Sequence, residues 1–177
     1  QRAMRLLKAN ATQYWIDPDE IGIMGASAGG HLAATLSVHH DWETYKPRDE
    51  IDRLSARPAF SVLMYPVVSF QDSLAHKGSR RNLLGETFSP ALRDSLSPER
   101  HVDAETPPAF VFHAMTDSSV PYQNSVVYAQ ALAQAGITHA LKLYPDGRHG
   151  MSLCEAGESS FAQWPGDLLR WLKAVAA

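Results

Sequence analysis

A stretch of ten residues, from Ile21 to Gly30, constrains the fold more than any other part of the chain. An apolar, strand-like run stops at Gly25, Ser27 follows in a G-x-S-x-G frame, and an apolar helical pattern resumes at Leu32. This arrangement predicts a sharp strand-to-helix turn with a serine at its tip, called a nucleophile elbow. Glycines on both sides of such a turn allow the strand and the helix to approach each other closely.

The same glycines allow two other interpretations of this stretch. Gly25 to Gly30 also fits G-x-x-x-x-G, the first part of a phosphate-binding loop, but that loop continues with Lys and Ser or Thr. His31 and Leu32 follow here instead, so that no side chain would reach the phosphates or a magnesium ion. A Gly- and Ser-rich turn without catalytic role is the remaining alternative to the elbow.

Composition narrows the function classes. The chain has 177 residues, of which 45% are hydrophobic and 20% charged, and this predicts one globular domain, residues 1–177, with a sizeable core. A net charge of -3 gives no reason to expect nucleic acid or an acidic membrane as a partner. A single cysteine, Cys154, excludes an internal disulfide and leaves the redox compartment undetermined.

Strand-like and helix-like segments alternate along the chain, and this predicts an α/β fold: a mainly parallel sheet with helices on both faces. The first expected helix is amphipathic, and the second turns Leu32, Ala33 and Leu36 inward. The expected strands cover residues 20–24, 59–65, 109–114 and 138–144, and the expected helices cover residues 1–15, 28–40, 122–135 and 158–177.

Residues 69–105 interrupt this alternation. They are polar and broken by glycines and prolines, and we expect a lid or a substrate-facing insertion, with a surface excursion of no functional role as the alternative. Ser89-Pro90 and Ser97-Pro98 combine a capping residue with a first-turn proline, so short helices are expected to begin there.

Three residues with catalytic chemistry directly follow expected strand ends: Ser27, Asp117 and His149. In parallel sheets, ligands bind beyond the carboxyl ends of the strands. The chain order Ser, Asp, His is that of α/β-hydrolases and differs from the orders of chymotrypsin-like and subtilisin-like enzymes. The sequence therefore predicts a catalytic triad made of these three residues.

Each member of this triad has an expected role. A serine hydroxyl needs an adjacent base to act as a nucleophile, and His149 would take the proton of Ser27. Asp117 would hold the imidazole tautomer and stabilise the imidazolium. The backbone N–H of Ala28, at the start of the following helix, would donate to the oxyanion. No cofactor and no metal is expected, and His39-His40-Asp41 is interpreted as a solvated helix end.

Alternatives exist for two of these assignments. Asp117 could instead be a turn or capping residue, and His149 could be an exposed turn histidine. His31 is left unassigned between the pocket and the core. Other acidic and histidine residues in loops are rival candidates, namely Asp72, His76, His101, Asp103 and Asp146.

Several motifs in order along nearly the whole chain resemble a known family. They are MGASAGGHL from Met24, YPV from Tyr65, RNLLG from Arg81, TPP from Thr106, H-x3-D-x2-VP from His113 and Y-x3-G-x-HG from Tyr144. Together they are similar to the acetyl esterase and acetylxylan esterase branch of the α/β-hydrolases, akin to hormone-sensitive-lipase-like carboxylesterases. The resemblance implies removal of short acyl groups, often acetyl, from sugars or xylan.

The sequence departs from that family in one respect. Members carry a His-Gly-Gly loop before the elbow that supplies the other oxyanion N–H groups, and only residues 1–20 precede the elbow strand here. About half of the family's strands, all N-terminal, would be missing, and the elbow strand would lie at a bare sheet edge. Three explanations are open: a C-terminal portion of a longer product, which we favour, pairing of the edge with another chain, or a shortened hydrolase.

The leading hypothesis is a serine carboxylesterase that acts on acetylated carbohydrate through an acyl-enzyme. The expected partners are thus a small-molecule or carbohydrate ester, with no nucleic acid and no membrane. A second copy of the chain, or a missing N-terminal segment, would cover the sheet edge. The alternatives are a serine peptidase of the prolyl-oligopeptidase type and an inactive partial domain that assembles through that edge.

Overall fold

The computed structural model describes residues 1–154, 157 and 159–175, and its centre is a four-stranded parallel sheet. The strands are β1 (Ile23–Ala26), β2 (Ser61–Met64), β3 (Ala109–Ala114) and β4 (His139–Tyr144), in the order β1-β2-β3-β4. Gly25 lies opposite Leu63, and Leu63 lies opposite Val111. The predicted α/β fold with a parallel sheet is confirmed.

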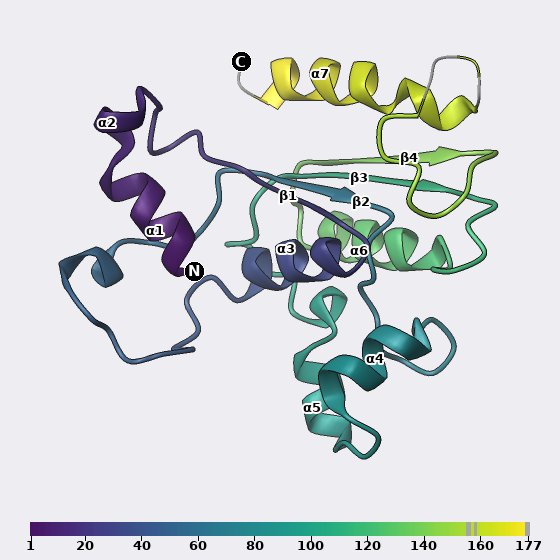
Figure 1. Ribbon diagram of the computed structural model, residues 1–177, viewed down its shortest axis with the longest axis horizontal. Coiled ribbons are helices and arrows are strands. Elements are labelled where there is room, and N and C mark those ends of the chain that lie inside the picture. Colours follow the sequence, from purple (N-terminus) through teal and green to yellow (C-terminus); the bar gives the residue numbers. More distant parts are fainter. Residues whose placement is uncertain (155–156, 158, 176–177) are drawn as a thin grey trace.

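Helices cover the two faces of the sheet (Figure 1). On one face lie α3 (Ala28–Val38) and α6 (Gln123–Gln134), and on the other lies α7 (Trp164–Val175), preceded by the short helix η3 (Ser160–Gln163). Across the described residues, every helix is too short or too polar to traverse a bilayer.

The strands pack through both faces. Leu63 and Val111 contact Tyr128 and Leu132 of α6 on one side, while Phe110 and Phe112 face Phe161 and Trp164 on the other side. Successive side chains of a strand point to opposite faces, so a strand that is covered on both faces must be apolar throughout. This explains the unbroken apolar runs that made these strands predictable.

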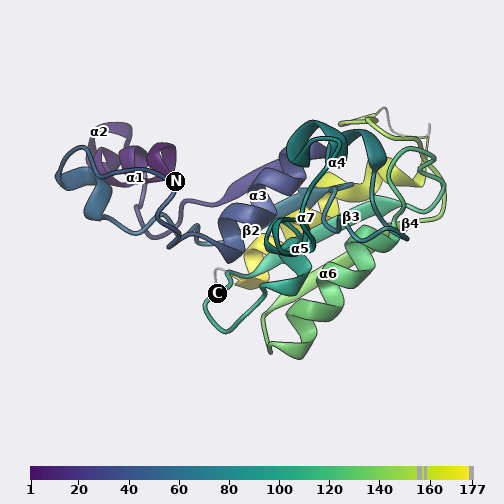
Figure 2. The same ribbon diagram turned by 90° about the horizontal axis from the view of Figure 1, so that it is seen from below.

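Two small helices lie apart from these layers. α1 (Arg2–Ala9) and α2 (Ala11–Tyr14) stand together at one end of the molecule, near β1. The short helix η1 (Glu50–Arg53) packs beside α1. Figure 2 shows α1, α2 and η1 separated from the body that the remaining helices form with the sheet. The prediction of a single helix over residues 1–15 is therefore wrong, because the helix is interrupted at Asn10, which ends α1 and precedes α2.

The segment 69–105 is more helical than expected. It contains α4 (Lys77–Leu84), α5 (Pro90–Ser95) and the short helix η2 (Pro98–Arg100). The two predicted helix starts are confirmed, and the Ser89 side chain accepts the Leu92 N–H at 3.1 Å. The sequence did not indicate α4, because its cap is the His76 ring, whose Nδ1 accepts the Ser79 N–H at 3.2 Å.

Three further expectations need correction. The first strand begins at Ile23, later than the expected 20–24. The last helix begins at Trp164, with Pro165 in its first turn, and the expected start at residue 158 lies outside the described residues. Leu32, expected to face inward, is 68% exposed. It lies on α3, which packs against β1 at the outer strand of the sheet, and this side of α3 therefore has little to pack against.

β1 is an edge strand within the described part of the chain. It pairs with β2 on one side, and no described strand pairs with its other side. The elbow strand was expected at a sheet edge, and this is confirmed. Met24, in the middle of β1, is half exposed.

β1 and α3 approach each other so closely that side chains would not fit between them. A Cβ atom on Gly25 would overlap the backbone carbonyl of Gly29. A Cβ atom on Gly30 would lie 2.7 Å from Cβ of Pro66, which lies two residues beyond the end of β2. The turn that carries Ser27 therefore requires glycine, which has no Cβ atom, at both Gly25 and Gly30.

Replacing Gly25 with alanine should lower the free energy of unfolding by about 1–3 kcal/mol, because the backbone of α3 must move to admit the methyl group. The matched control is Gly29→Ala, since no heavy atom lies within 4 Å of a Cβ there. Alanine within a helix stabilises by roughly 0.5–1 kcal/mol over glycine. Urea unfolding measures both variants, and equal stability of the two would contradict the close approach.

Candidate active site

Ser27 lies at the tip of a strained turn between β1 and α3. Its φ of 54° and ψ of -119° fall outside the regions that non-glycine residues favour. The Ser27 N–H donates to Met64 O at 3.0 Å, and the Ser27 carbonyl accepts the N–H of Val67 at 3.1 Å and of His31 at 3.1 Å. Hydrogen bonds from two neighbouring elements hold this conformation, which directs the side chain beyond the end of the sheet.

The structure brings Ser27, His149 and Asp117 into one hydrogen-bonded row. His149 Nε2 lies 2.8 Å from Ser27 Oγ, and His149 Nδ1 lies 2.6 Å from Asp117 Oδ2. Ser27 follows β1, Asp117 follows β3, and His149 follows β4. The three predicted residues therefore meet across the carboxyl ends of the parallel strands.

Asp117 is held from several directions. Its side chain is 1% exposed, and Oδ1 accepts the N–H of Ser119 at 2.8 Å and of Val120 at 3.0 Å. Burial by itself raises the pKa of the Asp117 carboxyl. Hydrogen bonds from His113, His149 and the two backbone N–H groups outweigh burial and hold this pKa well below its usual range. Asp117 is thus both a turn residue, through Oδ1, and the partner of His149, through Oδ2.

Sequence reasoning placed His113 only within a motif and gave it no role. His113 is the fifth residue of β3, and its side chain is fully buried. Its Nε2 lies 3.2 Å from Asp117 Oδ2 and 3.1 Å from the Val120 carbonyl, and its Nδ1 lies 2.8 Å from Ser125 Oγ. The available signal was a histidine inside an otherwise apolar strand.

Tyr65 is a second residue that sequence reasoning missed. It directly follows β2 with a positive φ of 35°, and its ring centroid lies 4.8 Å from that of His149. Burial raises the pKa of the Tyr65 hydroxyl. The ring packs against the imidazole and limits where the His149 side chain can move.

Ala28 is the first residue of α3 and is exposed beside Ser27. The N–H groups in the first turn of a helix have no intrahelical acceptor, and they carry the positive end of the helix dipole. Next to Ala28 is a hollow of about 310 Å³, and α4 forms its opposite side. The hollow is lined by Ala28, His31, Leu32, Ser79, Asn82 and Leu83.

The rival candidates lie elsewhere in the structure. Asp72 pairs with Arg80, His76 caps α4, and His101 Nε2 lies 2.8 Å from the Asp94 carbonyl. Asp103 accepts a bond within its own loop, and Asp146 accepts the N–H of Ser160 at the start of η3.

His31, which the sequence left unassigned between pocket and core, lines the hollow beside Ala28. It is buried, and its Nε2 lies 2.8 Å from the Leu96 carbonyl.

His39 corrects the interpretation of a solvated helix end. It is buried, its ring stacks on Trp42 with centroids 3.4 Å apart, and its Nε2 lies 3.1 Å from the Ser95 carbonyl. Among the residues that the structure describes, no three or more His, Cys, Asp or Glu side chains are grouped so as to hold a metal ion.

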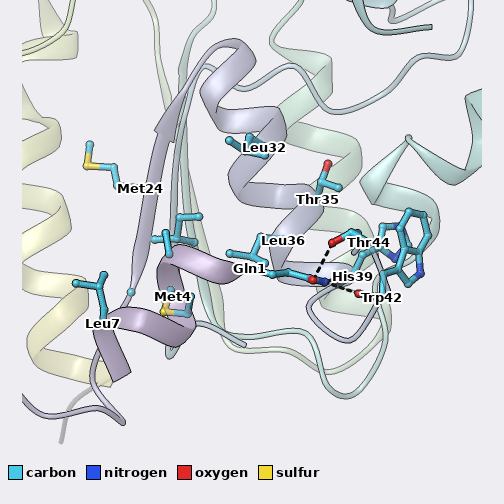
Figure 3. A pocket seen from close by; sticks show the side chains of 13 residues that line it. Gln1, Met4, Leu7, Met24, Leu32, Thr35, Leu36, His39, Trp42 and Thr44 are labelled. Atoms are coloured by element: carbon cyan, nitrogen blue, oxygen red, sulfur yellow. Dashed lines mark hydrogen bonds between the residues drawn. The ribbon is translucent and has the colours of Figure 1, made fainter. Parts of the chain in front are cut away.

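A larger hollow of about 480 Å³ lies along the open edge of β1 (Figure 3). Met24 of β1, Leu32 of α3 and Met4 of α1 are among the residues that line it, and most of its surface is apolar. At one end the Gln1 side chain donates to the Trp42 carbonyl at 2.8 Å and accepts from the Thr44 hydroxyl at 2.9 Å. Ser27, Asp117 and His149 are not among its lining residues, so this hollow is distinct from the hydrogen-bonded row that these three side chains form.

A profile of the BD-FAE family matches residues 1–132. The chain belongs to the BD-FAE family. Among curated relatives, Endo-1,4-beta-xylanase B of Butyrivibrio fibrisolvens is 36% identical over 93% of this chain and 25% of that protein. Acetylxylan esterase of Xylanibacter ruminicola is 33% identical over 100% of this chain and 35% of that protein.

Solved structures show the same relationship for this BD-FAE family chain. An acetyl ester-xyloside bifunctional hydrolase from Caldicellulosiruptor lactoaceticus is 39% identical with a TM-score of 0.92, over 98% of this chain and 63% of that one. The carboxylesterase Cest-2923 from Lactobacillus plantarum is 28% identical with a TM-score of 0.75, over 97% and 64%. The expected resemblance to α/β-hydrolases of the acetyl and acetylxylan esterase type is confirmed, and the names of the relatives agree with the predicted class of carboxylic ester hydrolase.

The share of each match that this chain covers is small. It spans about a quarter to a third of the two curated relatives and less than two thirds of the two solved structures. Together with the open edge of β1, this agrees with the prediction of a hydrolase fold that lacks N-terminal strands.

The pH dependence of stability should reveal the buried Asp117 carboxylate. Its pKa is lowered in the folded protein relative to about 3.9 in the unfolded chain, so its stabilisation is fully present above that value and is lost as pH falls below it. Asp117→Asn should therefore unfold more easily than the wild type at pH 7, and the difference should shrink as pH falls from about 4 toward 2.

Urea unfolding at a series of pH values measures this difference. Asp41→Asn removes a negative charge from an exposed position and serves as the matched control. A difference between Asp117→Asn and the wild type that stays constant across this pH range would contradict a stabilising carboxylate.

Proposed function

We propose that this chain carries the nucleophilic part of a serine carboxylesterase that removes short acyl groups, acetyl above all, from carbohydrate or xylan. The observation that supports it is the hydrogen-bonded row Ser27–His149–Asp117 at the carboxyl ends of three parallel strands. The substrate class rests on the relatives named as an acetylxylan esterase and an acetyl ester-xyloside hydrolase.

In the first half of the proposed reaction, Ser27 Oγ attacks the ester carbonyl carbon while His149 Nε2 accepts the hydroxyl proton. His149 then gives this proton to the departing sugar oxygen, and the acyl group remains on Ser27 as an ester. Asp117 accepts the Nδ1–H of His149 throughout and stabilises the imidazolium that forms transiently.

In the second half, water replaces the sugar. The water oxygen attacks the acyl carbonyl carbon while His149 takes a proton from the water. His149 then gives that proton to Ser27 Oγ when the carboxylic acid leaves. Negative charge develops on the carbonyl oxygen in both halves. The N–H of Ala28 at the start of α3 is proposed to donate to this oxygen, aided by the helix dipole.

The segment 69–105 is proposed to face the substrate. α4 contributes Ser79, Asn82 and Leu83 to the hollow of about 310 Å³ that begins at Ala28. This hollow is lined by Ala28, the residue after Ser27, and it has both polar and apolar lining, as an acetylated sugar would require.

The nucleophilicity of Ser27 is tested directly with a fluorophosphonate probe, which reacts with nucleophilic serines. The wild-type chain should be labelled at Ser27, and Ser27→Ala should abolish labelling. Asp117→Asn should slow labelling by up to about 10⁴-fold, the loss measured for the corresponding change in a related triad. Ser73→Ala, at an exposed serine outside the row, is the matched control and should be labelled like the wild type.

Mass spectrometry of the labelled peptides locates the modification, and labelling at another residue would contradict the proposed nucleophile. Substrate class is then compared with p-nitrophenyl acetate, an acetylated xylo-oligosaccharide and an X-Pro amide. Faster turnover of the amide would favour the peptidase alternative over the esterase.

The open edge of β1 is proposed to pair with a further strand. One oxyanion donor from Ala28 is half of what such sites use, and loss of a single donor costs about 10²–10³ in rate. More than a third of the chain of each of these two solved relatives lies outside the part that this chain matches, and we propose that such a segment pairs with β1 and supplies the second donor. When the 177-residue chain is made alone, a second copy is proposed to occupy this edge.

Light scattering after size exclusion tests the edge. The 177-residue chain should self-associate as its concentration rises, and Met24→Lys should shift it toward monomer, because a charge on an edge strand opposes pairing. Leu92→Lys, at an exposed leucine of α5, is the matched control and should behave like the wild type. A folded wild-type monomer at all concentrations would contradict pairing with a second copy.

A further inference from the structure

His113 is a fully buried polar side chain that the reaction described above does not use. It lies in β3, in the interior of the sheet between β2 and β4. A buried imidazole is costly unless both of its nitrogens find hydrogen-bond partners. Both do here, and one of these partners is the carboxylate of Asp117.

The partners define which nitrogen carries the proton. Nε2 faces two acceptors, Asp117 Oδ2 at 3.2 Å and the Val120 carbonyl at 3.1 Å, so it must be the N–H. Nδ1 faces the hydroxyl of Ser125, 2.8 Å away, which can donate its proton to that nitrogen. Ser125 is itself fully buried in the first turn of α6. The resulting chain of donors runs from Ser125 through His113 to Asp117.

His113 also closes the turn that carries Asp117. From the front, Asp117 Oδ1 accepts the N–H groups of Ser119 and Val120. From behind, the single Nε2–H of His113 is shared between Oδ2 and the Val120 carbonyl. Both oxygens of the carboxylate are therefore occupied, and the carboxylate cannot rotate without breaking bonds on both sides.

We propose that His113 is a positioning residue for the active site: its Nε2–H holds Asp117 Oδ2, the same oxygen that receives the Nδ1–H of His149. This inference rests on the proposed function, because it assigns His113 to the triad of that reaction. Sharing Oδ2 between two N–H donors fixes the direction of the hydrogen bond to His149. It also spreads the carboxylate charge, so that the oxygen is a weaker acceptor toward His149 than a carboxylate bound by His149 alone.

Electrostatics agrees with this geometry. Burial raises the pKa of Asp117, and among the hydrogen bonds that lower it, that of His113 has the largest effect. His113 thereby helps to keep Asp117 ionised in a site with little access to water.

The decisive variant is His113→Phe, which keeps an aromatic ring but removes the donor. It should lower kcat by about 10–100-fold, by analogy with the loss found when a hydrogen-bond partner that orients a metal-binding histidine is removed. KM should change by less than about threefold, because His113 does not touch the substrate. The acidic limb of the pH profile of kcat/KM should move to higher pH, because Asp117 without this donor holds the protonated His149 more tightly.

Two further variants separate positioning from packing. His113→Gln retains an N–H donor and should therefore have a kcat, and a position of the acidic limb, between those of His113→Phe and the wild type. Ser125→Ala should shift kcat and the acidic limb in the same direction as His113→Phe, but by less. Tyr128→Phe is the matched control, since it alters a fully buried side chain of α6 that packs on the same strand outside this network. It should leave kcat and the pH profile unchanged. If His113→Phe fails to fold, His113→Gln and Ser125→Ala carry the test.

A readout without turnover keeps this proposal separate from the proposed function. The Nδ1 proton of His149 gives a downfield proton NMR signal, which should shift and exchange faster with water in His113→Phe. If the wild type does not react with a fluorophosphonate, the proposed function fails while this signal still tests His113. The proposal would be overturned if His113→Phe had the same kcat, the same acidic limb and the same NMR signal as the wild type, whatever its melting temperature.

Discussion

Parallel pairing of four strands, covered by helices on both faces, is the constraint on which the candidate site depends. Because all strands run in the same direction, their carboxyl ends lie along one edge, and the residues that follow β1, β3 and β4 meet there. Ser27, Asp117 and His149 are separated by up to 122 positions in the chain but join in a row of two hydrogen bonds. Apolar packing of Phe110 and Phe112 on one face, and of Val111 on the other, stabilises this alignment.

The elbow adds a local constraint to this global one. Ser27 adopts a strained conformation because β1 and α3 are pressed together at Gly25 and Gly30. The backbone of Ser27 is hydrogen-bonded to Met64, the last residue of β2, and to Val67 in the segment that follows β2. Sheet, helix and turn thus support one another, and strain at one residue is offset by packing and hydrogen bonds around it.

The site is built in layers of decreasing exposure. Ser27 and His149 are partly exposed at the surface, Asp117 lies beneath them, and His113 and Ser125 lie deeper in the fold. Each layer restrains the one above it through a hydrogen bond. On the opposite flank, β1 leaves its outer edge and an apolar hollow uncovered within the described residues. The row Ser27–His149–Asp117 is therefore well supported from the side of β3 and β4, and open on the side of β1.

Much of this could be predicted from local sequence. Near-continuous apolar runs indicated β2 and β3, since a strand that is buried on both faces is apolar almost throughout. The G-x-S-x-G frame indicated the elbow, and the positions after strand ends indicated Ser27, Asp117 and His149. These features depend on neighbouring residues and on the direction of the chain, which are visible without coordinates.

Other features depend on contacts between distant segments, and only the tertiary structure decided them. Leu32 fits an inward position by helical period, but α3 meets no further strand beyond β1 and the side chain stays exposed. α4 begins at an imidazole cap that no usual sequence pattern predicts. The bond from His113 to Asp117 requires β3, the turn after it and α6 to converge. The sequence by itself determined which residues carry the proposed chemistry, because strand ends and turns are local; the folded chain decided which residues hold them in place, because that depends on packing.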